Sequence, residues 1–409
     1  MNKLLVDGIY AANIVKLKDI AEKRTTKNID GLVTETFTNS AENGIISQSD
    51  FFDRTITNDK NISGYFIVEP DDFVYNPRIS TFAPVGPINR NKLGRSGVMS
   101  PLYLVFHTHD VEPEYLEWYF KSNAWHQFMR DNGNTGARSD RFSIGDAEFF
   151  NMPIPIPPVE VQKTIARTLT TLDTKVILEK NEVEKFQNLK SAMLTKMFPK
   201  KGENVPEIRF PGFTDAWEQR KLGDVCEIKD SARIPNSEWT ESGVPYIRAS
   251  DVTNENIDGV LFISQERYEF YKNRTGAPTK DDVLFNGGGE IGKCLLIADE
   301  NPIYVQGGAV LYACTSESSK LVGQYLKIYF ETTHAKSYID TASAGGTMKH
   351  FTLKPSQMMP ILIPSVDEQE KLGTYFFNLD HLITLHQRKY EKLIDTKKAF
   401  LEKLIGGEK

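Results

Sequence analysis

The sequence predicts an α+β protein formed by internal duplication, in which two long, antiparallel coiled-coil helices separate two globular α/β domains with pseudo-two-fold symmetry. Three observations predict this fold: a repeat of about 200 residues, a heptad stripe in each copy, and short β-branched and aromatic runs bounded by turn residues. The chain has 409 residues, of which 40% are hydrophobic and 25% are charged. This length and composition are typical of a folded protein with two or three domains.

The repeat is clearest where a segment beginning at Met152 aligns without gaps with a segment beginning at Met359. The alignment extends to Phe198 and Ile405 and is identical at 16 of 47 positions. A repeat this long indicates a duplicated domain rather than a short solenoid unit. We therefore expect a first globular domain over residues 1–151, a first helix and linker over 152–204, a second globular domain over 205–358 and a second helix over 359–409.

Each copy begins with a proline-rich stretch, residues 153–158 or 360–364, and continues into a long helical pattern. Because proline has no N–H donor, these stretches predict strand edges or polyproline spacers. Apolar residues then recur at alternating steps of four and three, which is typical of a coiled-coil seam. The predicted seam consists of Ile165, Leu169, Leu172, Val176, Val183 and Phe186 in the first helix, and Leu372, Phe376, Leu379, Ile383, Tyr390 and Leu393 in the second.

Two arrangements of these helices are open. Each helix could pack back on its own globular domain, or the two could pack on each other as an antiparallel spacer. The apolar stripe is narrow and sustained over several heptads, which favours the second arrangement. Within the globular domains, the pattern predicts one helix near residues 113–130 and another near 320–340.

The motifs that resemble catalytic or cofactor sites lack the surrounding residues that such sites need. Residues 287–292 match G-x-G-x-x-G, but a strand-like run follows where a dinucleotide site needs a helix, so we expect a glycine-rich hairpin turn. His107 and His109 have no second ligand cluster that would complete a metal site. Residues 75–78 (YNPR) resemble an amine-holding motif of methyltransferases, with arginine in place of a second proline. We expect no catalytic residue, metal or cofactor in this chain, and an enzyme with an unrecognised site remains an alternative.

Apolar segments and cysteine usage indicate where in the cell the protein is expected. No apolar run approaches the roughly 20 residues that a membrane-spanning helix needs. The first 15 residues do not have the pattern of a signal peptide. Three widely spaced cysteines are typical of a reducing compartment and exclude a disulfide framework. We therefore expect a cytoplasmic protein with no membrane partner.

The net charge of −6 does not indicate a nucleic-acid binder, but the local distribution is more informative. Residues 73–109 carry four basic and no acidic side chains, and residues 132–141 and 343–350 are glycine-rich, basic and equivalently placed in the two copies. Glycine permits close approach to a ligand, while arginine and lysine reach phosphates or guanine edges. Ordinary solvated loops are the alternative. The candidate contacts are Arg78, Arg90, Lys92, Arg95, Thr135, Gly136, Arg138 and Arg141 in the first copy, and Lys293, Gly345, Gly346, Thr347 and Lys349 in the second.

The chain resembles the specificity (S) subunits of type I restriction–modification enzymes. The resemblance is carried by residues 205–213 (VPEIRFPGF), by the proline-rich segments leading to Gln162 and Gln369, and by the Leu-Asp pairs at 172–173 and 379–380. It covers nearly the whole chain, although the RFPGF-type segment precedes only the second globular domain.

This resemblance implies a non-catalytic targeting subunit that binds double-stranded DNA. Each of two target-recognition domains would read one half of an asymmetric bipartite site, and the helices would set the spacer. The helices would also recruit two methyltransferase (M) subunits that bind S-adenosylmethionine, and a restriction (R) motor subunit that uses ATP and Mg would join them. The alternative class is a coiled-coil adaptor with two ligand- or peptide-binding domains.

Overall fold

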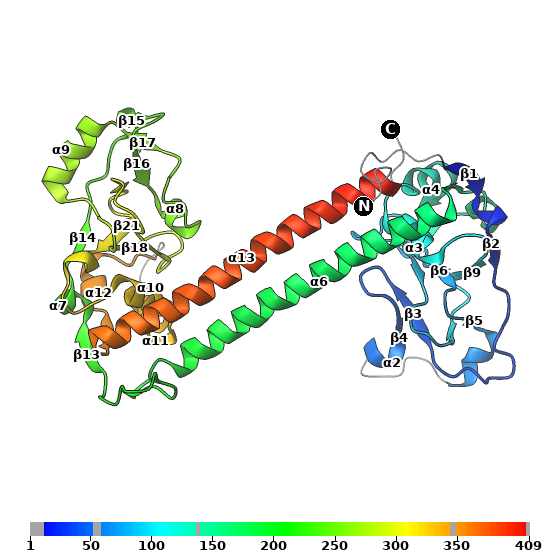
Figure 1. Ribbon diagram of the computed structural model, residues 1–409, viewed down its shortest axis with the longest axis horizontal. Helices are drawn as coiled ribbons and strands as arrows, with labels where there is room; N and C mark the ends of the chain where they lie inside the picture. The colour runs from blue at the N-terminus through cyan, green and yellow to red at the C-terminus, as the bar shows by residue number, and fades with distance from the viewer. Residues whose placement is uncertain (1–11, 52–58, 136–139, 344–348, 406–409) are drawn as a thin grey trace. The chain divides into compact units, whose positions relative to one another are not determined.

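The computed structural model describes residues 12–51, 59–135, 140–343 and 349–405. The chain divides into two compact units, the first made of Met1–Glu179 with Lys389–Lys409 and the second of Lys180–Arg388. Two long helices, α6 (Val159–Lys196) and α13 (Val366–Ile405), contribute to both units (Figure 1). In the described part of the chain, no helix is long and apolar enough to cross a membrane.

The first unit is organised around an antiparallel four-stranded sheet with the strand order β2-β9-β6-β7. Phe73 and Phe106 stack across the two central strands with ring centroids 5.5 Å apart, and Phe120 packs edge-on against both. The strands are β1 (Asn13–Lys16), β2 (Ala21–Lys23), β3 (Phe37–Ser40), β4 (Gly44–Ser47), β5 (Phe66–Val68), β6 (Phe73–Tyr75), β7 (Ile88–Arg90), β8 (Gly97–Met99), β9 (Leu104–Thr108), β10 (Asn134–Thr135), β11 (Phe142–Ser143) and β12 (Pro153–Ile156). The short helices are α2 (Gln48–Phe51), α3 (Pro113–Lys121), α4 (His126–Asn132) and α5 (Asp146–Phe149).

The second unit repeats this sheet as β14-β21-β18-β19 and adds another sheet with the order β15-β17-β16-β20. The added sheet has its own small core, in which Tyr246 and Tyr304 stack beside Tyr271. The strands of the second unit are β13 (Glu218–Lys221), β14 (Ile228–Asp230), β15 (Trp239–Thr240), β16 (Val244–Ile247), β17 (Phe262–Ile263), β18 (Val283–Asn286), β19 (Cys294–Leu296), β20 (Tyr304–Val305), β21 (Val310–Ala313) and β22 (Pro360–Ile363). Its shorter helices are α7 (Leu222–Val225), α8 (Ala249–Thr253), α9 (Gln265–Thr275), α10 (Gly323–Glu331), α11 (Thr333–Ala342) and α12 (Leu353–Gln357).

The single helices predicted near residues 113–130 and 320–340 are in fact helix pairs, α3–α4 and α10–α11. At the two breaks, the Ser122 hydroxyl donates to the carbonyl of Tyr119 at 2.6 Å, and the Thr332 hydroxyl donates to that of Tyr329 at 2.7 Å. A hydroxyl that satisfies a terminal carbonyl gives the backbone an alternative to the next helical turn. The prediction of one helix in each copy was wrong. It relied on the spacing of apolar residues, and the hydroxyl groups that end the first helix of each pair do not change that spacing.

The proline-rich stretches form strands β12 and β22, which pair antiparallel with β1 and β13. This confirms the prediction of strand edges. The Tyr119 hydroxyl donates to the carbonyl of Pro153 in the first unit, and the Tyr329 hydroxyl donates to that of Pro360 in the second, both at 3.2 Å. The duplication is therefore visible in individual hydrogen bonds as well as in the order of elements.

A glutamine near the start of each long helix ties the helix to its globular domain. Gln162 accepts a hydrogen bond from the backbone N–H of Glu112 and donates one to the carbonyl of Pro157, both at 2.8 Å. Gln369 accepts from the N–H of Val322 and donates to the carbonyl of Pro364, both at 3.0 Å. Because the amide offers both a donor and an acceptor, one side chain joins the proline-rich strand to the N-terminal end of α3 or α10.

The predicted seam residues differ in their surroundings along each helix. The first members, Ile165 and Leu169 in α6 and Leu372 and Phe376 in α13, are fully buried in the core of a globular domain. Leu379 is also buried, while Leu172, Val176, Val183, Phe186, Ile383, Tyr390 and Leu393 are half-buried. The start of each helix thus packs on its own domain, as one of the two arrangements requires.

Further along, α6 and α13 run antiparallel beside each other within each unit. In the first unit Asp173 pairs with Lys397. In the second unit the Phe186 ring stacks on His386 with centroids 5.4 Å apart, and Lys190 Nζ lies 2.6 Å from Asp380 Oδ1. Within each unit, a long helix therefore contacts the globular core over one part and the other long helix over another, while the role of the two helices as a spacer stays a prediction.

Apolar residues at or directly after the end of each long helix are buried in the core of the unit where that helix ends. Met197 and Phe198, which directly follow α6, lie in the core of the second unit, where Phe198 stacks on Tyr325. Leu404 and Ile405, the equivalent residues of α13, lie in the core of the first unit. Each globular core is therefore completed by the end of a helix that starts in the other copy of the repeat.

Candidate nucleic-acid interface

In each unit, two loops that are distant in sequence meet at one end of the central sheet. In the first unit, the Phe142 N–H donates to the carbonyl of Pro77 at 2.8 Å. In the second, the Phe351 N–H donates to the carbonyl of Gly287 at 2.8 Å. Pro77 and Gly287 each follow a central strand, β6 or β18. The loop pairs around residues 77–83 with 140–142, and 287–292 with 349–351, are called the paired loops below.

An asparagine anchors the start of each paired loop. The side-chain amide of Asn76 donates to the carbonyl of Asn39 at 2.8 Å, and that of Asn286 donates to the carbonyl of Ala249 at 2.9 Å. Asn286 also donates to the Thr253 hydroxyl at 3.0 Å. The Asn76 amide is therefore engaged by backbone, which gives the YNPR segment a structural role in place of amine binding.

The first unit places two arginines opposite each other in its paired loops. Arg78 and Arg141 form an isolated antiparallel bridge. Arg78 is exposed and Arg141 is half-buried, and no carboxylate among the described residues forms an ion pair with either. Like charges directly opposite each other on paired strands are destabilising. A bound anion such as a phosphate would relieve this repulsion, which makes the pair a candidate backbone contact.

The second unit builds its paired loops mainly from glycine. A Cβ added to Gly287 would lie 2.7 Å from the carbonyl oxygen of Phe351, so a side chain cannot be accommodated there. Gly288 lies against the His350 ring, and Lys349 is exposed next to it. Residues 287–292 connect the antiparallel strands β18 and β19, which confirms the predicted hairpin turn. A ligand can therefore approach the backbone closely beside a lysine and a histidine.

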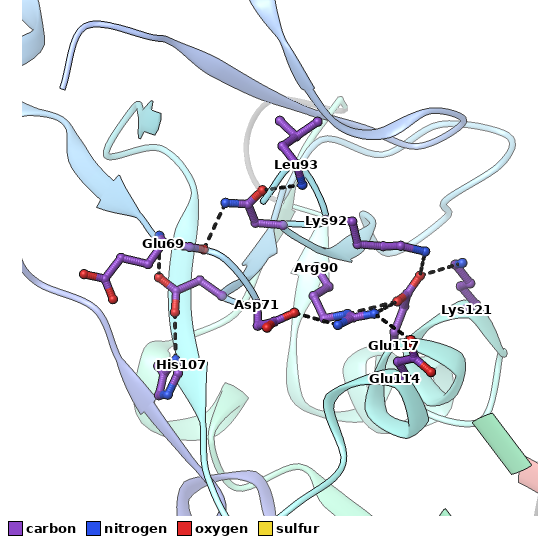
Figure 2. A network of polar contacts seen from close by, with 11 residues as sticks. Glu69, Asp71, Arg90, Lys92, Leu93, His107, Glu114, Glu117 and Lys121 are labelled. Atoms are coloured by element: carbon purple, nitrogen blue, oxygen red, sulfur yellow. Dashed lines mark hydrogen bonds and ion pairs between the residues drawn. The ribbon is translucent and has the colours of Figure 1, made fainter. Parts of the chain in front are cut away.

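Arg90 and Lys92, which were predicted to contact a nucleic acid, belong to an ionic network around Glu117 (Figure 2). The Arg90 side chain is only 9% exposed, and its nitrogens lie 2.6 Å from Asp71 and 2.8 Å from Glu117. Lys92 and Lys121 approach Glu117 to 3.1 and 2.8 Å. The guanidinium of Arg90 is thus buried and paired with carboxylates, so we assign it to the structure of the domain and not to ligand contact.

The same network shifts the acidity of Glu117. Burial acts to raise the pKa of this carboxyl, but the nearby charges of Lys121, Arg90 and Lys92 outweigh burial and lower the pKa to about 2. Glu117 therefore remains ionised at neutral pH although its side chain is 7% exposed. Lys92 is held by this carboxylate while its own side chain stays largely exposed.

Arg95 is also held by an acid that is distant in sequence. Its Nε and Nη2 atoms each donate to Glu35 at 2.7 Å in a bidentate pair. Residues 73–109 contain no acid, but Glu35 and Glu117 come from outside that range and neutralise three of its four cations. Arg78 is the cation of this range that keeps no carboxylate partner among the residues described.

The remaining predicted contacts are distributed as follows. Thr135 is exposed at the end of β10, and Lys293 is exposed with its Nζ 4.0 Å from Glu290. Gly136, Arg138, Gly345, Gly346 and Thr347 lie outside the described residues. His350 was not among the predicted contacts, although its position in a glycine-rich basic loop was a usable signal.

Comparison with known proteins identifies the family. Residues 12–187 and 214–394 both match the type I restriction modification DNA specificity domain. The chain belongs to this family. The two matches cover most of the chain and fall on the two copies of the internal repeat.

Two relatives of this chain are named as specificity subunits of type I restriction enzymes. The chain is 23% identical over 271 residues to the type I restriction enzyme MjaVIII specificity subunit of Methanocaldococcus jannaschii, which covers 64% of this chain and 63% of that subunit. It is 22% identical over 323 residues to the putative type I restriction enzyme MjaX specificity subunit of the same organism, covering 76% and 71%. The first alignment thus spans less than two thirds of its relative's length.

A solved structure supports the fold. The crystal structure of the type I restriction-modification system S subunit from M. genitalium superposes with a TM-score of 0.60 at 13% identity, covering 98% of this chain and 97% of that one. At this identity the likeness concerns the fold alone. The two chains therefore share their fold over nearly the full sequence.

Proposed function

We propose that this chain is the DNA sequence-specificity subunit of a type I restriction–modification complex, with each globular domain reading one half of a bipartite site. The observation that carries the proposal is the recurrence of the paired loops at equivalent places in two copies of a DNA specificity domain. The N–H groups of Phe142 and Phe351 donate to the carbonyls of Pro77 and Gly287, so the two loops of each pair are joined by the same backbone hydrogen bond in both copies.

The side chains on the paired loops differ between the two copies, and this supports an asymmetric target. The first unit offers Arg78 and Arg141, whereas the second offers Lys349 and His350 beside glycines. Among the residues that the structure describes, a sheet such as β15-β17-β16-β20 occurs in the second unit and not in the first. Since different side chains read different base edges, the two half-sites should differ in sequence.

Within this proposal, the long helices act as a coiled-coil spacer between two target-recognition domains. The domain boundaries are those expected from the sequence, residues 1–151, 152–204, 205–358 and 359–409. The support is the heptad pattern of half-buried residues in α6 and α13 and their antiparallel contacts within each unit. A continuous helix keeps a defined length because each residue adds 1.5 Å.

The same helices offer surfaces for partner subunits. Leu178 in α6 and Leu385 in α13, which are equivalent in the repeat, are 57% and 47% exposed. Exposed apolar side chains at matching places suit two identical partners. We therefore include two methyltransferase (M) subunits and a restriction (R) subunit in the proposal. S-adenosylmethionine, ATP and Mg would be bound by those partners, and this chain would supply targeting without catalysis.

Genome-wide mapping of methylated adenines in the host, with and without this gene, tests the proposed function. We expect one asymmetric bipartite sequence to lose methylation when the gene is deleted and to regain it on complementation. Unchanged methylation, together with co-purification of partners that do not modify DNA, would favour the adaptor alternative.

Binding of the reconstituted complex to a duplex carrying that sequence gives the residue-level test. We expect the double variant Arg78→Ala/Arg141→Ala to weaken binding and to lower the salt dependence of log K by about 2, or about 1 for each lost phosphate contact. Lys92→Ala is the matched control, because its ammonium is already paired with Glu117. An equal effect of both substitutions would contradict the placement of the site at the paired loops.

A further inference from the structure

Phe82 lies in a turn of the first unit that is closed by backbone hydrogen bonds. The Ser80 N–H donates to the carbonyl of Ala83 at 3.0 Å, and the Ala83 N–H donates back to the carbonyl of Ser80 at 3.2 Å. These reciprocal bonds hold Phe82 outward, where it is 72% exposed. An exposed phenylalanine forgoes the stabilisation that burial of its ring would give.

The position of Phe82 makes its exposure informative. Single exposed apolar residues are common on protein surfaces. This one lies four residues after Arg78, in the same paired loop that brings Arg78 opposite Arg141. The same loop therefore carries an exposed aromatic ring and an arginine that has no carboxylate partner among the described residues. Nucleic-acid-binding proteins use this combination, in which arginine holds phosphates and the ring stacks on bases or wedges between them.

The corresponding turn of the second unit has no aromatic residue, which argues against a general structural role for Phe82. That turn, residues 287–292, contains three consecutive glycines. A partner that docks equally on both copies, such as one of two identical subunits, would need the ring in both. A ligand that differs between the copies, such as the two halves of an asymmetric DNA site, would not.

We propose, resting on the DNA-reading function above, that Phe82 inserts at a base step of the first half-site, next to phosphates held by Arg78 and Arg141. The inserted ring unstacks that step. The first unit therefore reads how easily its half-site is deformed as well as the base edges, since some steps unstack more readily than others. The second unit reads its half-site without such a wedge.

The test uses the complex of the full chain with its methyltransferase subunits, bound to a duplex carrying the mapped site. Four forms are compared: the wild type, Phe82→Ala, Phe82→Trp and the control Leu32→Ala, which removes another exposed apolar side chain from the same unit. Affinity is measured over a range of salt concentrations. Permanganate reactivity of thymines, which rises when a thymine is unstacked, is recorded across the first half-site and its flanks.

We expect Phe82→Ala to weaken binding roughly 5- to 150-fold with an unchanged salt slope, and to abolish any enhanced permanganate reactivity. Phe82→Trp should bind like the wild type because it keeps an aromatic face, and Leu32→Ala should have no effect. Affinity of Phe82→Ala within twofold of the wild type would overturn the inference. Reduced recovery of methyltransferase subunits with unchanged DNA contacts would also overturn it, by assigning the ring to a protein partner.

Different results would contradict the role of Phe82 and the DNA-reading function on which it rests. If Arg78→Ala weakens binding while Phe82→Ala does not, the paired loops bind DNA without a wedge, and only the inference falls. If the wild-type complex binds no duplex that carries the mapped site, the proposed function itself fails.

Discussion

Glu117 shows how a single buried carboxylate can organise several cations. Its side chain contacts Arg90, Lys92 and Lys121, and Arg90 also reaches Asp71 from strand β7 (Figure 2). Helix α3, which carries Glu117, is thereby joined to the edge of the central sheet. A buried pair of this kind is costly to break because removing one partner leaves the other charge uncompensated.

We expect Glu117→Gln to destabilise the first unit by about 3 kcal/mol at neutral pH. The folded-state pKa of about 2 lies below the ordinary 4.5, so the ionised carboxylate stabilises the fold fully above about pH 4.5. That contribution is lost as pH falls towards 2, and the difference between variant and wild type should shrink over this range. Urea unfolding of the full chain at several pH values, followed by tryptophan fluorescence, measures it.

Glu114→Gln provides the control for this prediction. Glu114 lies 3.8 Å from the same guanidinium, but its side chain is half exposed. Its loss should therefore change the free energy of unfolding by no more than about 0.5 kcal/mol. Equal effects of the two substitutions, or a difference independent of pH, would show that the network does not act through the charge of Glu117.

The same residues show where prediction of the site from sequence was limited. The acid-free range 73–109 drew attention to Arg78, which has no carboxylate partner among the described residues and whose contact with a nucleic acid stays a prediction. It equally suggested Arg90 and Arg95, which are neutralised by Glu117 and Glu35. A local charge count does not include carboxylates that tertiary folding brings in, so it cannot separate ligand-binding arginines from structural ones.

At the scale of elements, charged residues interrupt the apolar seam of the long helices at matching places. Lys190 in α6 contacts Asp380 at 2.6 Å, and the equivalent Lys397 in α13 contacts the equivalent Asp173. Lys190 also reaches Glu331 of α10 at 2.7 Å. Burial acts to lower the pKa of Lys190, but Glu331 and Asp380 outweigh it and raise the pKa. Such polar positions within a seam specify register and orientation at some cost in stability.

We expect Lys190→Leu to destabilise the second unit by about 2 kcal/mol, because Asp380 and Glu331 would then face each other without a cation. The triple variant Lys190→Leu/Asp380→Leu/Glu331→Gln should recover most of this loss, since it removes the uncompensated charges together. Urea unfolding of the full chain measures both. Lys185→Leu, at an exposed pair with Glu182, is the control and should stay within about 0.5 kcal/mol.

Lys190→Leu as stable as the wild type would indicate that the seam gains nothing from this ion pair. The sequence predicted the seam itself from its periodicity, and Lys190, four residues after Phe186, falls on the same spacing. It could not show which carboxylate Lys190 meets, because Asp380 and Glu331 come from separate elements of the fold.

At the scale of the whole molecule, features that depend on local pattern were predictable. The repeat, the long helices, the proline-rich strands and the hairpin at residues 287–292 follow from periodicity, proline and glycine placement. The sheet β15-β17-β16-β20 was not predictable, because β15, β17 and β20 have two residues each and pair across long intervals. Its stability comes from the aromatic cluster of Tyr246, Tyr271 and Tyr304, which no short window reveals.

The duplication leads to a test of the spacer role proposed for the helices. Deleting residues 177–183 from α6 and the equivalent 384–390 from α13 removes one heptad from each and keeps the seam in phase. Seven residues correspond to about 10 Å of helix, or about three base pairs of B-form DNA. We expect the methylated site to keep both half-sites while its spacer shortens by about three base pairs, measured by mapping methylated adenines in the host.

Deletion of four residues from each helix would break the heptad phase and should abolish methylation. A changed half-site preference in the heptad variant would mean that the helices take part in base reading and do not act only as a ruler.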